Sequence, residues 1–206
     1  MKIGGKNRLV IGLTGGPGTG KSLAAKFMQE KGAVILSGDE AGKRAVETRP
    51  VLNQLVRTFG RKILKRDGDL DRRKLGQIVF GDPDELEKLN DIVHPRLLRI
   101  LKADIRERKR QGAPLIVVDA ALIFEWGIAN WCNYILVVTA RRAIRMERLI
   151  KSGLTRKEAI DRINSQIPDR DKVALADYVI ENKGTKADLR RKVDEFLKLI
   201  NAGAFN

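Results

Sequence analysis

Apolar residues in this chain gather in five short runs, separated mostly by stretches in which apolar residues recur at helical spacing. Each run is apolar at successive positions, which is typical of a strand buried on both faces of a parallel sheet. Strands and helices in this alternating order predict an α/β fold, a five-stranded parallel sheet flanked by helices. The predicted strands are residues 9–13, 33–36, 115–118, 134–138 and 178–180.

The sequence also marks several helix ends. Gly32 follows a helical stretch and predicts its C-terminal cap. A threonine with an acidic residue three positions later predicts one capping box at Thr155 with Glu158 and another at Thr185 with Asp188. The helix after Thr185 is expected to pack on the core through one apolar face, formed by Leu189, Val193, Phe196, Leu197 and Ile200.

The segment between the second and third predicted strands is long enough to form a lobe, and it contains helical patterns and turn signals. We therefore expect the whole chain, 1–206, to form one domain with a core at about 1–60 and 112–206. A helical insertion at about 61–111 interrupts this core. We expect an insertion of this size to bind the specific substrate.

The first predicted strand runs into a glycine-rich turn and a helix. Residues 8–22 read RLVIGLTGGPGTGKS and fit the phosphate-binding pattern G-x-x-x-x-G-K-[ST]. Such a loop turns its backbone N–H groups inward at the positive end of a helix, so that phosphate oxygens bind there. Lys21 then contacts the β- and γ-phosphates, and Ser22 completes the shell of a Mg²⁺ ion. The expected nucleotide cradle is Gly15, Gly16, Pro17, Gly18, Thr19, Gly20, Lys21 and Ser22.

Composition limits the kinds of protein that this chain can be. The chain has 206 residues, 43% of them hydrophobic, enough for one globular domain with a proper core. Its single cysteine, Cys132, excludes an internal disulfide and a thiolate metal cluster and fits a reducing compartment. The N-terminal segment lacks the pattern of a signal peptide, and no apolar stretch is long enough to span a membrane. We expect a cytoplasmic protein with no membrane partner.

The net charge of +15 could indicate a nucleic-acid ligand. The positive charge is spread out, however, and its densest run, residues 106–110, is explained as the solvated C-terminal turn of a helix. With two Tyr and two Trp, the chain has few aromatic residues for base stacking. We do not expect nucleic acid as the main ligand, because a small phosphorylated substrate explains the charge equally well.

Two aspartates follow predicted strands. Asp119 ends the third apolar run, where an ionised carboxylate needs a compensating cation or hydrogen bond. We expect Mg²⁺ or its water shell there, with a capping or salt-bridged aspartate as the alternative. Asp39 follows the second strand and could accept a proton from a substrate hydroxyl that attacks the γ-phosphate. From spacing alone, helix capping explains Asp39 equally well.

Four segments resemble dephospho-CoA kinases of the bacterial type, from the phosphate loop to about residue 195. They are GLTGGPGTGKS, then DGDLDRRKLGQIVFGDPDELEKLNDIVHP in the insertion, VVDAALIFE at the third strand, and RINSQIP followed by KVALADYVIENKG. The insertion and the last segment separate this family from other P-loop kinases. The resemblance implies a P-loop kinase fold with ATP and Mg²⁺. It also implies phosphorylation of the 3′-hydroxyl of dephospho-CoA, the last step of coenzyme A biosynthesis.

The resemblance also implies roles for individual residues. Asp39 falls on the second aspartate of the family's D-A-D motif, the general base. Arg148 lies in a lid at about 143–168 whose cations neutralise charge on the transferred phosphoryl group, and Asn182 and Gly184 fall on the loop near the adenine. The implied catalytic residues are Asp39, Lys21 and Arg148, the substrate contacts Asp39, Lys43, His94 and Asp119, and the metal ligands Ser22 and Asp119.

The chain departs from the family's pattern at several positions. Ser37 replaces the first aspartate of D-A-D, and Lys43 stands where an arginine is usual, which removes a two-pronged phosphate contact. In the lid, Arg145 stands where a glutamine is common, and Ser152 falls on the second customary arginine. Lys151 supplies a point charge next to Ser152. We expect these changes to weaken positioning of the substrate or metal rather than to remove activity.

Several alternatives stay open. His94 also fits a histidine at a helix start, and Arg148 fits a surface arginine. A diverged P-loop kinase acting on another nucleoside or nucleotide is the main alternative function, and a nucleic-acid-associated P-loop ATPase is a further one. Residues 182–185 come within one position of the guanine-reading motif N-K-x-D, but Thr185 lacks the carboxylate that binds guanine. The sequence leaves the oligomeric state open.

Overall fold

The computed structural model describes residues 8–79 and 82–203. The chain divides into two compact units, one formed by Met1–Ser37 with Glu107–Asn206 and the other by Gly38–Arg106. The second unit begins at Gly38, earlier than the residue 61 expected for the insertion, because the helices that follow Gly38 share its core.

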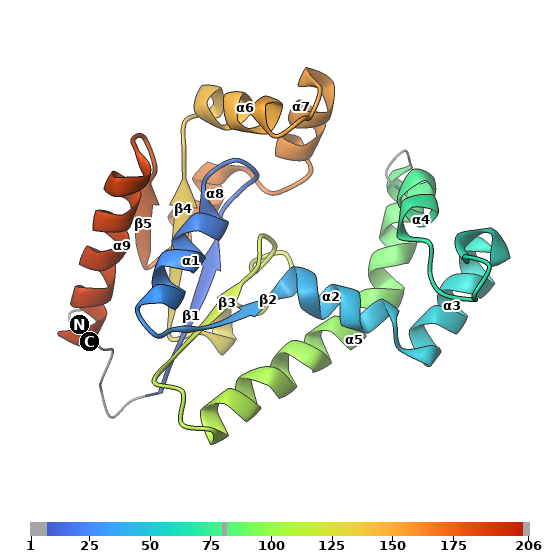
Figure 1. Ribbon diagram of the computed structural model, residues 1–206, viewed down its shortest axis with the longest axis horizontal. Helices are drawn as coiled ribbons and strands as arrows, with labels where there is room; N and C mark the ends of the chain where they lie inside the picture. Colours follow the sequence, from blue (N-terminus) through green and yellow to red (C-terminus); the bar gives the residue numbers. More distant parts are fainter. Residues whose placement is uncertain (1–7, 80–81, 204–206) are drawn as a thin grey trace. The chain divides into compact units, whose positions relative to one another are not determined.

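The first unit is built on a five-stranded sheet in which all neighbouring strands are parallel. Their spatial order is β2-β3-β1-β4-β5 (Figure 1). This confirms the α/β fold and the parallel sheet predicted from the apolar runs. The strands are β1 (Leu9–Thr14), β2 (Val34–Ser37), β3 (Leu115–Asp119), β4 (Tyr134–Thr139) and β5 (Tyr178–Glu181).

Each strand ends one residue later than the apolar run that predicted it. The ladder of backbone hydrogen bonds does not depend on side-chain polarity, so it continues past the apolar core to the carboxyl edge of the sheet. The added residues are all polar, namely Thr14, Ser37, Asp119, Thr139 and Glu181. Open parallel sheets bind ligands at this edge, where the strand order reverses around β1.

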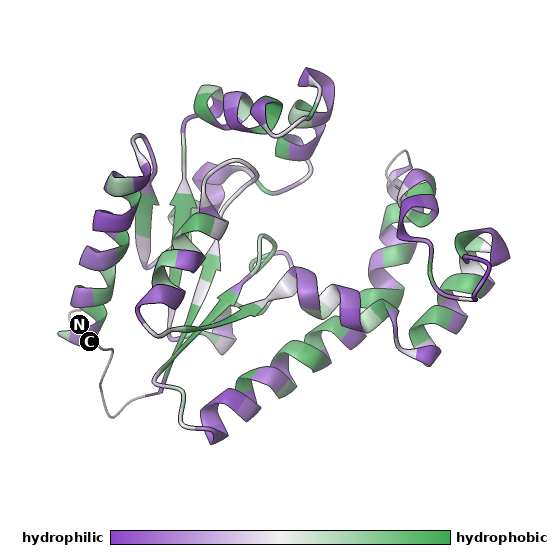
Figure 2. Ribbon diagram, in the orientation of Figure 1, coloured by the Kyte–Doolittle hydropathy of each residue, from purple (hydrophilic) through white to green (hydrophobic). Residues whose placement is uncertain are grey.

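Helices α1 (Lys21–Glu30) and α9 (Lys186–Asn201) pack beside each other against the sheet (Figure 1). Their apolar faces join the strands in one core, in which Leu13, Met28 and Phe196 are fully buried. Figure 2 shows the result, with hydrophobic strands and with helices that carry hydrophobic and hydrophilic residues in alternating bands.

Helices α6 (Arg142–Lys151) and α7 (Arg156–Asn164) form a hairpin at the top of the view in Figure 1. Leu149 and Ile163 form its small core together with Ala159, and Met146 packs against them. The short α8 (Asp169–Ala174) leads back towards β5, and a 3₁₀ turn, η2 (Ala129–Trp131), precedes β4.

The three helix ends predicted from sequence are confirmed. Capping boxes begin α7 at Thr155 and α9 at Thr185, with the threonine hydroxyl and the acidic side chain each accepting a backbone N–H group. Gly32 follows α1 with a φ of 97° and donates its N–H group to the Gln29 carbonyl at 2.9 Å.

The second unit is a helical lobe with its own core, in which Leu55, Ile63 and Val79 are almost fully buried. His94 and Pro95 lie in the middle of its longest helix, so the explanation of His94 as a helix-start residue is wrong. A proline removes one backbone donor, and this helix continues through it. The elements are α2 (Gly38–Val46), α3 (Arg49–Phe59), η1 (Arg61–Ile63), α4 (Arg72–Val79) and α5 (Pro83–Arg110), whose last turn belongs to the first unit.

Across residues 8–79 and 82–203, none of the helices has the length and apolarity needed to cross a membrane.

Candidate active site

The phosphate loop, residues 15–20, forms a tight turn between β1 and α1. The hydroxyl of Thr19 donates to the Gly16 carbonyl at 2.8 Å, and the N–H group of Thr19 donates to the same oxygen at 3.3 Å. Leu23 and Ala24 then donate to the Gly20 carbonyl at 3.0 Å as α1 begins. The first N–H groups of a helix have no partner inside it, so this end of α1 offers donors and a positive dipole to an anion.

Gly20 is required at its position for two reasons. Its φ of 97° lies in the left-handed region, and a Cβ atom there would lie 2.4 Å from Nδ2 of Asn182. Asn182 is buried and donates from that nitrogen to the Thr19 carbonyl at 2.7 Å. Its own N–H group donates to the Thr139 carbonyl at 2.7 Å. Asn182 therefore holds the phosphate loop to the end of β4, while Gly184 is exposed.

The Lys21 ammonium group and the Asp119 carboxylate form an ion pair at the carboxyl edge of the sheet. Their side chains are only 15% and 13% exposed. Strand register places Asp119 opposite Leu13 on β1 and opposite Ser37 on β2. The structure thus brings the predicted metal-binding aspartate to the lysine of the phosphate loop. It also bears out the alternative, because this aspartate is salt-bridged.

Ser22 is exposed in the first turn of α1. In the part of the chain that the structure describes, no three His, Cys, Asp or Glu side chains form a group able to hold a metal ion. A metal here would have a single carboxylate, Asp119, and the Ser22 hydroxyl as protein ligands. Mg²⁺ fits such a sparse set of oxygens, because it keeps several waters and binds substrate phosphates rather than an all-protein cage.

Arg148 reaches the phosphate loop from α6. Its Nη1 atom donates to the carbonyl oxygens of Gly18 at 3.2 Å and Thr19 at 3.3 Å. The explanation of Arg148 as an ordinary surface arginine therefore does not hold. The contact places a guanidinium group beside the loop in which a triphosphate is expected.

Arg145 also contacts the loop, although the sequence suggested it only as a departure from the family pattern. Its Nε atom donates to the Pro17 carbonyl at 2.8 Å, and its Nη1 atom donates to Oδ2 of Asp169 at 2.6 Å. Asp169 also accepts from the Thr139 hydroxyl at 3.1 Å. A Cβ atom at Gly16 would lie 2.4 Å from Nη2 of Arg145, so the guanidinium group packs directly on the loop backbone.

Lys172 on α8 is fully buried, although no sequence pattern singles it out. Its Nζ atom donates to the Ala121 carbonyl at 2.8 Å and to Oε1 of Gln166 at 2.9 Å, and lies 3.7 Å from Oε1 of Glu125. Burial lowers the pKa of Lys172, and the nearby Glu125 carboxylate partly opposes this shift. The Thr14 hydroxyl donates to the same Ala121 carbonyl at 3.0 Å, so one buried network joins β1, the segment after β3 and α8.

A cavity of about 610 Å³ borders the Arg145–Asp169 pair. It is lined by the end of β4, the start of α6, the connection between α7 and α8, and Glu181 at the end of β5. The exposed Arg141 and Arg142 line one part of it. A volume of this size suits an organic ligand of nucleotide dimensions.

Three predicted substrate contacts lie in the second unit. Asp39 is exposed in the first turn of α2, two residues along the chain from Ser37 at the sheet edge. Lys43 forms an ion pair with Glu40 on the same exposed face of α2. His94 is half-buried, and burial lowers its pKa against the opposing effect of Asp91, so its imidazole is neutral at pH 7.

Ser152 and Lys151, at the end of α6, have structural roles of their own. The Ser152 hydroxyl donates to the Leu149 carbonyl at 2.7 Å and ends α6. Lys151 forms an exposed ion pair with Glu147 at 2.6 Å. Of the α6 cations, Arg145 and Arg148 are therefore the ones with contacts to the phosphate loop.

Residues 9–188 match the family model of dephospho-CoA kinases. A curated relative from Fusobacterium nucleatum, named dephospho-CoA kinase, is 37% identical over 193 residues, which cover 93% of this chain and 98% of the relative. A relative of the same name from Geobacillus kaustophilus is 40% identical over 192 residues, covering 92% and 96%. The crystal structure of TT1252 from Thermus thermophilus has a TM-score of 0.79 at 35% identity, and the match covers 94% of this chain and 98% of that one.

Proposed function

Because this chain belongs to the dephospho-CoA kinase family, we propose that it transfers the γ-phosphoryl group of ATP to the 3′-hydroxyl of dephospho-CoA. The products are CoA and ADP, and the reaction is the last step of coenzyme A biosynthesis. The enzyme is a phosphotransferase with an alcohol group as acceptor. The observation that carries the proposal is the Lys21–Asp119 pair at the phosphate loop, within a chain that matches the family over residues 9–188.

The phosphate loop binds the triphosphate of ATP. Its backbone N–H groups and the N-terminus of α1 hold phosphate oxygens, and Lys21 exchanges the Asp119 carboxylate for the β- and γ-phosphates. The cavity lined by Arg141 and Arg142 is large enough for the nucleoside, with Asn182 and Gly184 on the adjoining loop. ATP and a small-molecule acceptor are both found in the cytoplasm, so we infer a cytoplasmic location for the protein.

Ser22 and Asp119 are the residues that hold Mg²⁺ in this proposal. Their hydroxyl and carboxylate oxygens are ligands of the type that Mg²⁺ prefers. When bound, the ion neutralises charge on the β- and γ-phosphate oxygens. The Lys21–Asp119 ion pair supports this assignment, because a Lys21 side chain that moved to the phosphates would leave the Asp119 carboxylate without its cation.

Arg148 stabilises charge on the phosphoryl group during transfer. Its Nη1 atom already lies against two loop carbonyls, those of Gly18 and Thr19. Arg145 acts differently, because its Nε and Nη1 atoms donate to the Pro17 carbonyl and to the Asp169 carboxylate. We assign Arg145 to holding the loop in shape rather than to contacting the phosphates.

Asp39 is the general base in this proposal. Its exposed carboxylate lies in the first turn of α2, which begins directly after β2. The last residue of β2, Ser37, is opposite Asp119 in the strand register. Asp39 accepts the proton of the 3′-hydroxyl as that oxygen attacks the γ-phosphorus in line with the leaving ADP. His94 and Lys43 are assigned to holding the acceptor.

The Asp39→Asn variant tests the base. General-base catalysis contributes about 10²- to 10⁴-fold, so kcat should fall by that order while the KM for ATP stays near the wild-type value. Glu87→Gln, which neutralises an exposed carboxylate on α5 of the same unit, is the matched control and should keep the wild-type kcat. Wild-type turnover by Asp39→Asn with dephospho-CoA would show the base assignment to be wrong.

A variant of the phosphate loop tests the role of ATP binding separately from the role of the general base. Lys21→Met should lose most of the transfer rate, because the β- and γ-phosphates lose their ammonium partner. Lys26→Met removes the same charge from an exposed position of α1 and should behave as wild type. Retained activity in Lys21→Met would rule out the phosphate-loop mechanism.

A diverged kinase with another nucleoside or nucleotide as acceptor is the alternative that the changes at Ser37 and Lys43 favour. The guanine-reading alternative has less support, because the Thr185 hydroxyl is bonded to the Asp188 carboxylate at 2.8 Å within a capping box. Thermal stabilisation by ATP and by GTP, each with and without Mg²⁺, distinguishes the nucleotides. We expect ATP with Mg²⁺ to stabilise the protein most.

A further inference from the structure

Lys172 is fully buried on α8, and no step proposed above uses it. Moving an ammonium group out of water is costly unless protein oxygens replace the water. Three oxygens surround this one, namely the Ala121 carbonyl at 2.8 Å, Oε1 of Gln166 at 2.9 Å and Oε1 of Glu125 at 3.7 Å. An apolar side chain of similar length would fill the same space without that cost, so the buried cation favours a role beyond packing.

The three oxygens belong to two segments that are distant in the sequence. Ala121 and Glu125 lie in the turn after β3, whereas Gln166 lies in the connection between α7 and α8. The N–H group of Ile167, the next residue of that connection, also donates to Oε1 of Glu125, at 3.2 Å. An ammonium group has three donors, so Lys172 holds both segments at once.

The turn after β3 begins where the sheet stops holding the chain. Asp119 is the last residue of β3, and the N–H group of Ala120 makes one more backbone hydrogen bond to β1, at 3.1 Å. Ala121 lies beyond that bond, and its carbonyl accepts from Lys172 at 2.8 Å and from the Thr14 hydroxyl at 3.0 Å. These two donors therefore fix the chain two residues after Asp119.

Helix α8 reaches the phosphate loop by a separate contact. Its first residue, Asp169, pairs with Arg145 at 2.6 Å, and the Nε atom of Arg145 donates to the Pro17 carbonyl at 2.8 Å. Arg145 thus acts on the loop itself, whereas Lys172 acts on the segment that follows Asp119. We therefore expect the two cations to control different parts of ATP binding.

We propose that Lys172 is a positioning residue for Asp119: it holds the segment after β3 so that the Asp119 carboxylate is presented to the Mg²⁺ ion that accompanies ATP. The inference rests on the proposed function, in which Ser22 and Asp119 hold that ion. Residues that orient a metal ligand from outside the coordination sphere typically change metal affinity by about 10- to 100-fold when they are replaced. Lys172 acts on Asp119 through the backbone, so we expect an effect of about tenfold.

The test measures binding of a non-hydrolysable ATP analogue by calorimetry, once with Mg²⁺ and once with EDTA in its place. The ratio of the two Kd values is the Mg²⁺ gain. In Lys172→Met this gain should fall about tenfold, while the Kd in EDTA stays near the wild-type value. Arg145→Met should show the opposite pattern, with both Kd values raised and the Mg²⁺ gain unchanged, because the loop rather than Asp119 loses its support.

The control for stability is Ile200→Ala, which removes buried apolar contacts from the last turn of α9. It should lower the midpoint of urea unfolding and leave the Mg²⁺ gain at the wild-type value. A smaller change in the same place is Thr14→Val, which keeps the shape of the side chain but removes the hydroxyl donor to Ala121. We expect its Mg²⁺ gain to fall about threefold, and this variant carries the test if Lys172→Met does not fold.

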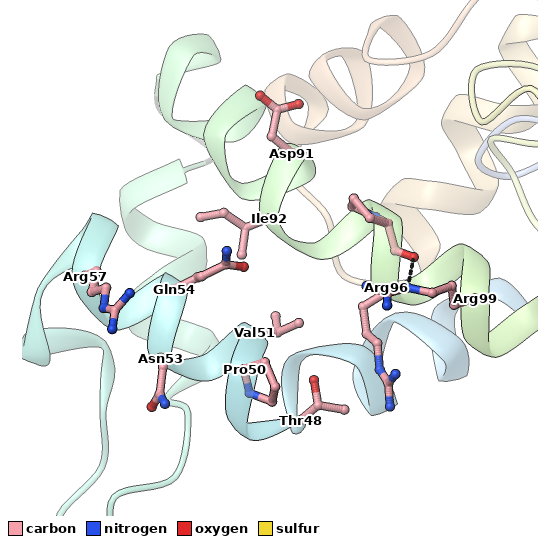
Figure 3. Close-up of a pocket in the computed structure, with 11 residues that line it drawn as sticks. Thr48, Pro50, Val51, Asn53, Gln54, Arg57, Asp91, Ile92, Arg96 and Arg99 are labelled. Carbon is pink, nitrogen blue, oxygen red and sulfur yellow. Dashed lines mark hydrogen bonds between the residues drawn. The ribbon is translucent and has the colours of Figure 1, made fainter.

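Kinetics provide a second measurement. The kcat of Lys172→Met should fall about tenfold at a fixed Mg²⁺ concentration and recover as Mg²⁺ is raised, while the KM for dephospho-CoA stays at the wild-type value. The acceptor contacts Asp39, Lys43 and His94 belong to the helical unit, as do all the residues that line the cavity between α3 and α5 in Figure 3. Lys172 and the residues that hold it belong to the other unit.

A wild-type Mg²⁺ gain in both Lys172→Met and Thr14→Val, or an equal loss of gain in Ile200→Ala, would overturn the role of Lys172. Formation of CoA by the wild type would still uphold the proposed function in that case. If the wild type forms no CoA, the proposed function fails, and the Mg²⁺ gain measured by calorimetry still decides whether Lys172 positions Asp119.

Discussion

The Arg145–Asp169 pair joins α6 and α8 beside the phosphate loop, and its removal tests whether an ion pair outside the loop sequence shapes the nucleotide site. Arg145 is 6% exposed and Asp169 is 26% exposed at the side chain. Replacing Arg145 with Met keeps most of the apolar volume but removes the donors to the Pro17 carbonyl and to Asp169. Asp169 then keeps the Thr139 hydroxyl as its remaining described partner.

The magnitude follows from burial. Breaking a buried ion pair by removing one partner costs about 3–5 kcal/mol. Asp169 is about a quarter exposed, so water recovers part of its solvation, and we expect Arg145→Met to lower the free energy of unfolding by about 2–4 kcal/mol. The loop also loses its contact at Pro17, so we expect the Kd for ATP to rise by about tenfold, which corresponds to about one lost hydrogen bond to a charged group.

A double-mutant cycle isolates the pair. Urea unfolding of wild type, Arg145→Met, Asp169→Asn and the double variant should give a coupling energy of about 1.5–3 kcal/mol. The matched control is the Lys151–Glu147 pair on the exposed side of α6, whose coupling should not exceed experimental error. Equal coupling in the two cycles, or an unchanged Kd for ATP in Arg145→Met, would refute the reasoning.

Three further predictions follow from buried or strained groups. Lys172→Met should lower the free energy of unfolding, measured in urea at pH 7, by about 2–4 kcal/mol. Because burial lowers the folded pKa of Lys172 below 10.5, the stability of the wild type relative to this variant should rise between pH 7 and 10. A stability difference that does not change with pH would contradict the pKa shift. Burial raises the pKa of Cys132 to about 12. Iodoacetamide at pH 8 should therefore label this thiol about 1,000-fold more slowly in the native protein than in urea. Equal labelling rates would exclude a shielded thiol. Gly20→Ala and Gly32→Ala both place alanine at a φ of 97°, but a Cβ atom meets Asn182 only at Gly20, so only Gly20→Ala should abolish thermal stabilisation by ATP. If Gly32→Ala abolished it as well, backbone strain alone would explain the loss.

The sheet and the phosphate loop could be predicted because their signals are local. Uninterrupted apolar runs gave each strand to within one residue at either end, and the missed residues were polar ones at the carboxyl edge. The loop around Lys21 is contiguous in the chain. Asp119 was predicted as a carboxylate at a strand end that needs a compensating cation, and the parallel sheet brings that strand end to the edge where the loop lies.

The contacts that hold the loop could not be predicted, because they join segments far apart in sequence. Arg145 donates to the Pro17 carbonyl, 128 positions away in the sequence, and no pattern near either residue predicts the contact. In α8 the apolar pattern even misleads, because Lys172 is fully buried while the neighbouring Val173 is 37% exposed. A helix of six residues has too few turns for periodicity to show which face is buried. At His94 the general rule that proline begins helices failed, because α5 continues through Pro95.

The central claim is that ATP bound at the phosphate loop gives its γ-phosphoryl group to the 3′-hydroxyl of dephospho-CoA, leaving ADP, and one measurement addresses it directly. Purified protein is given ATP and Mg²⁺ with dephospho-CoA, adenosine or another nucleoside, and ADP release is followed while the product is identified by mass. We expect dephospho-CoA to give the highest kcat/KM and a product with the mass of CoA. No CoA formation, or a higher kcat/KM with another acceptor, would contradict the claim.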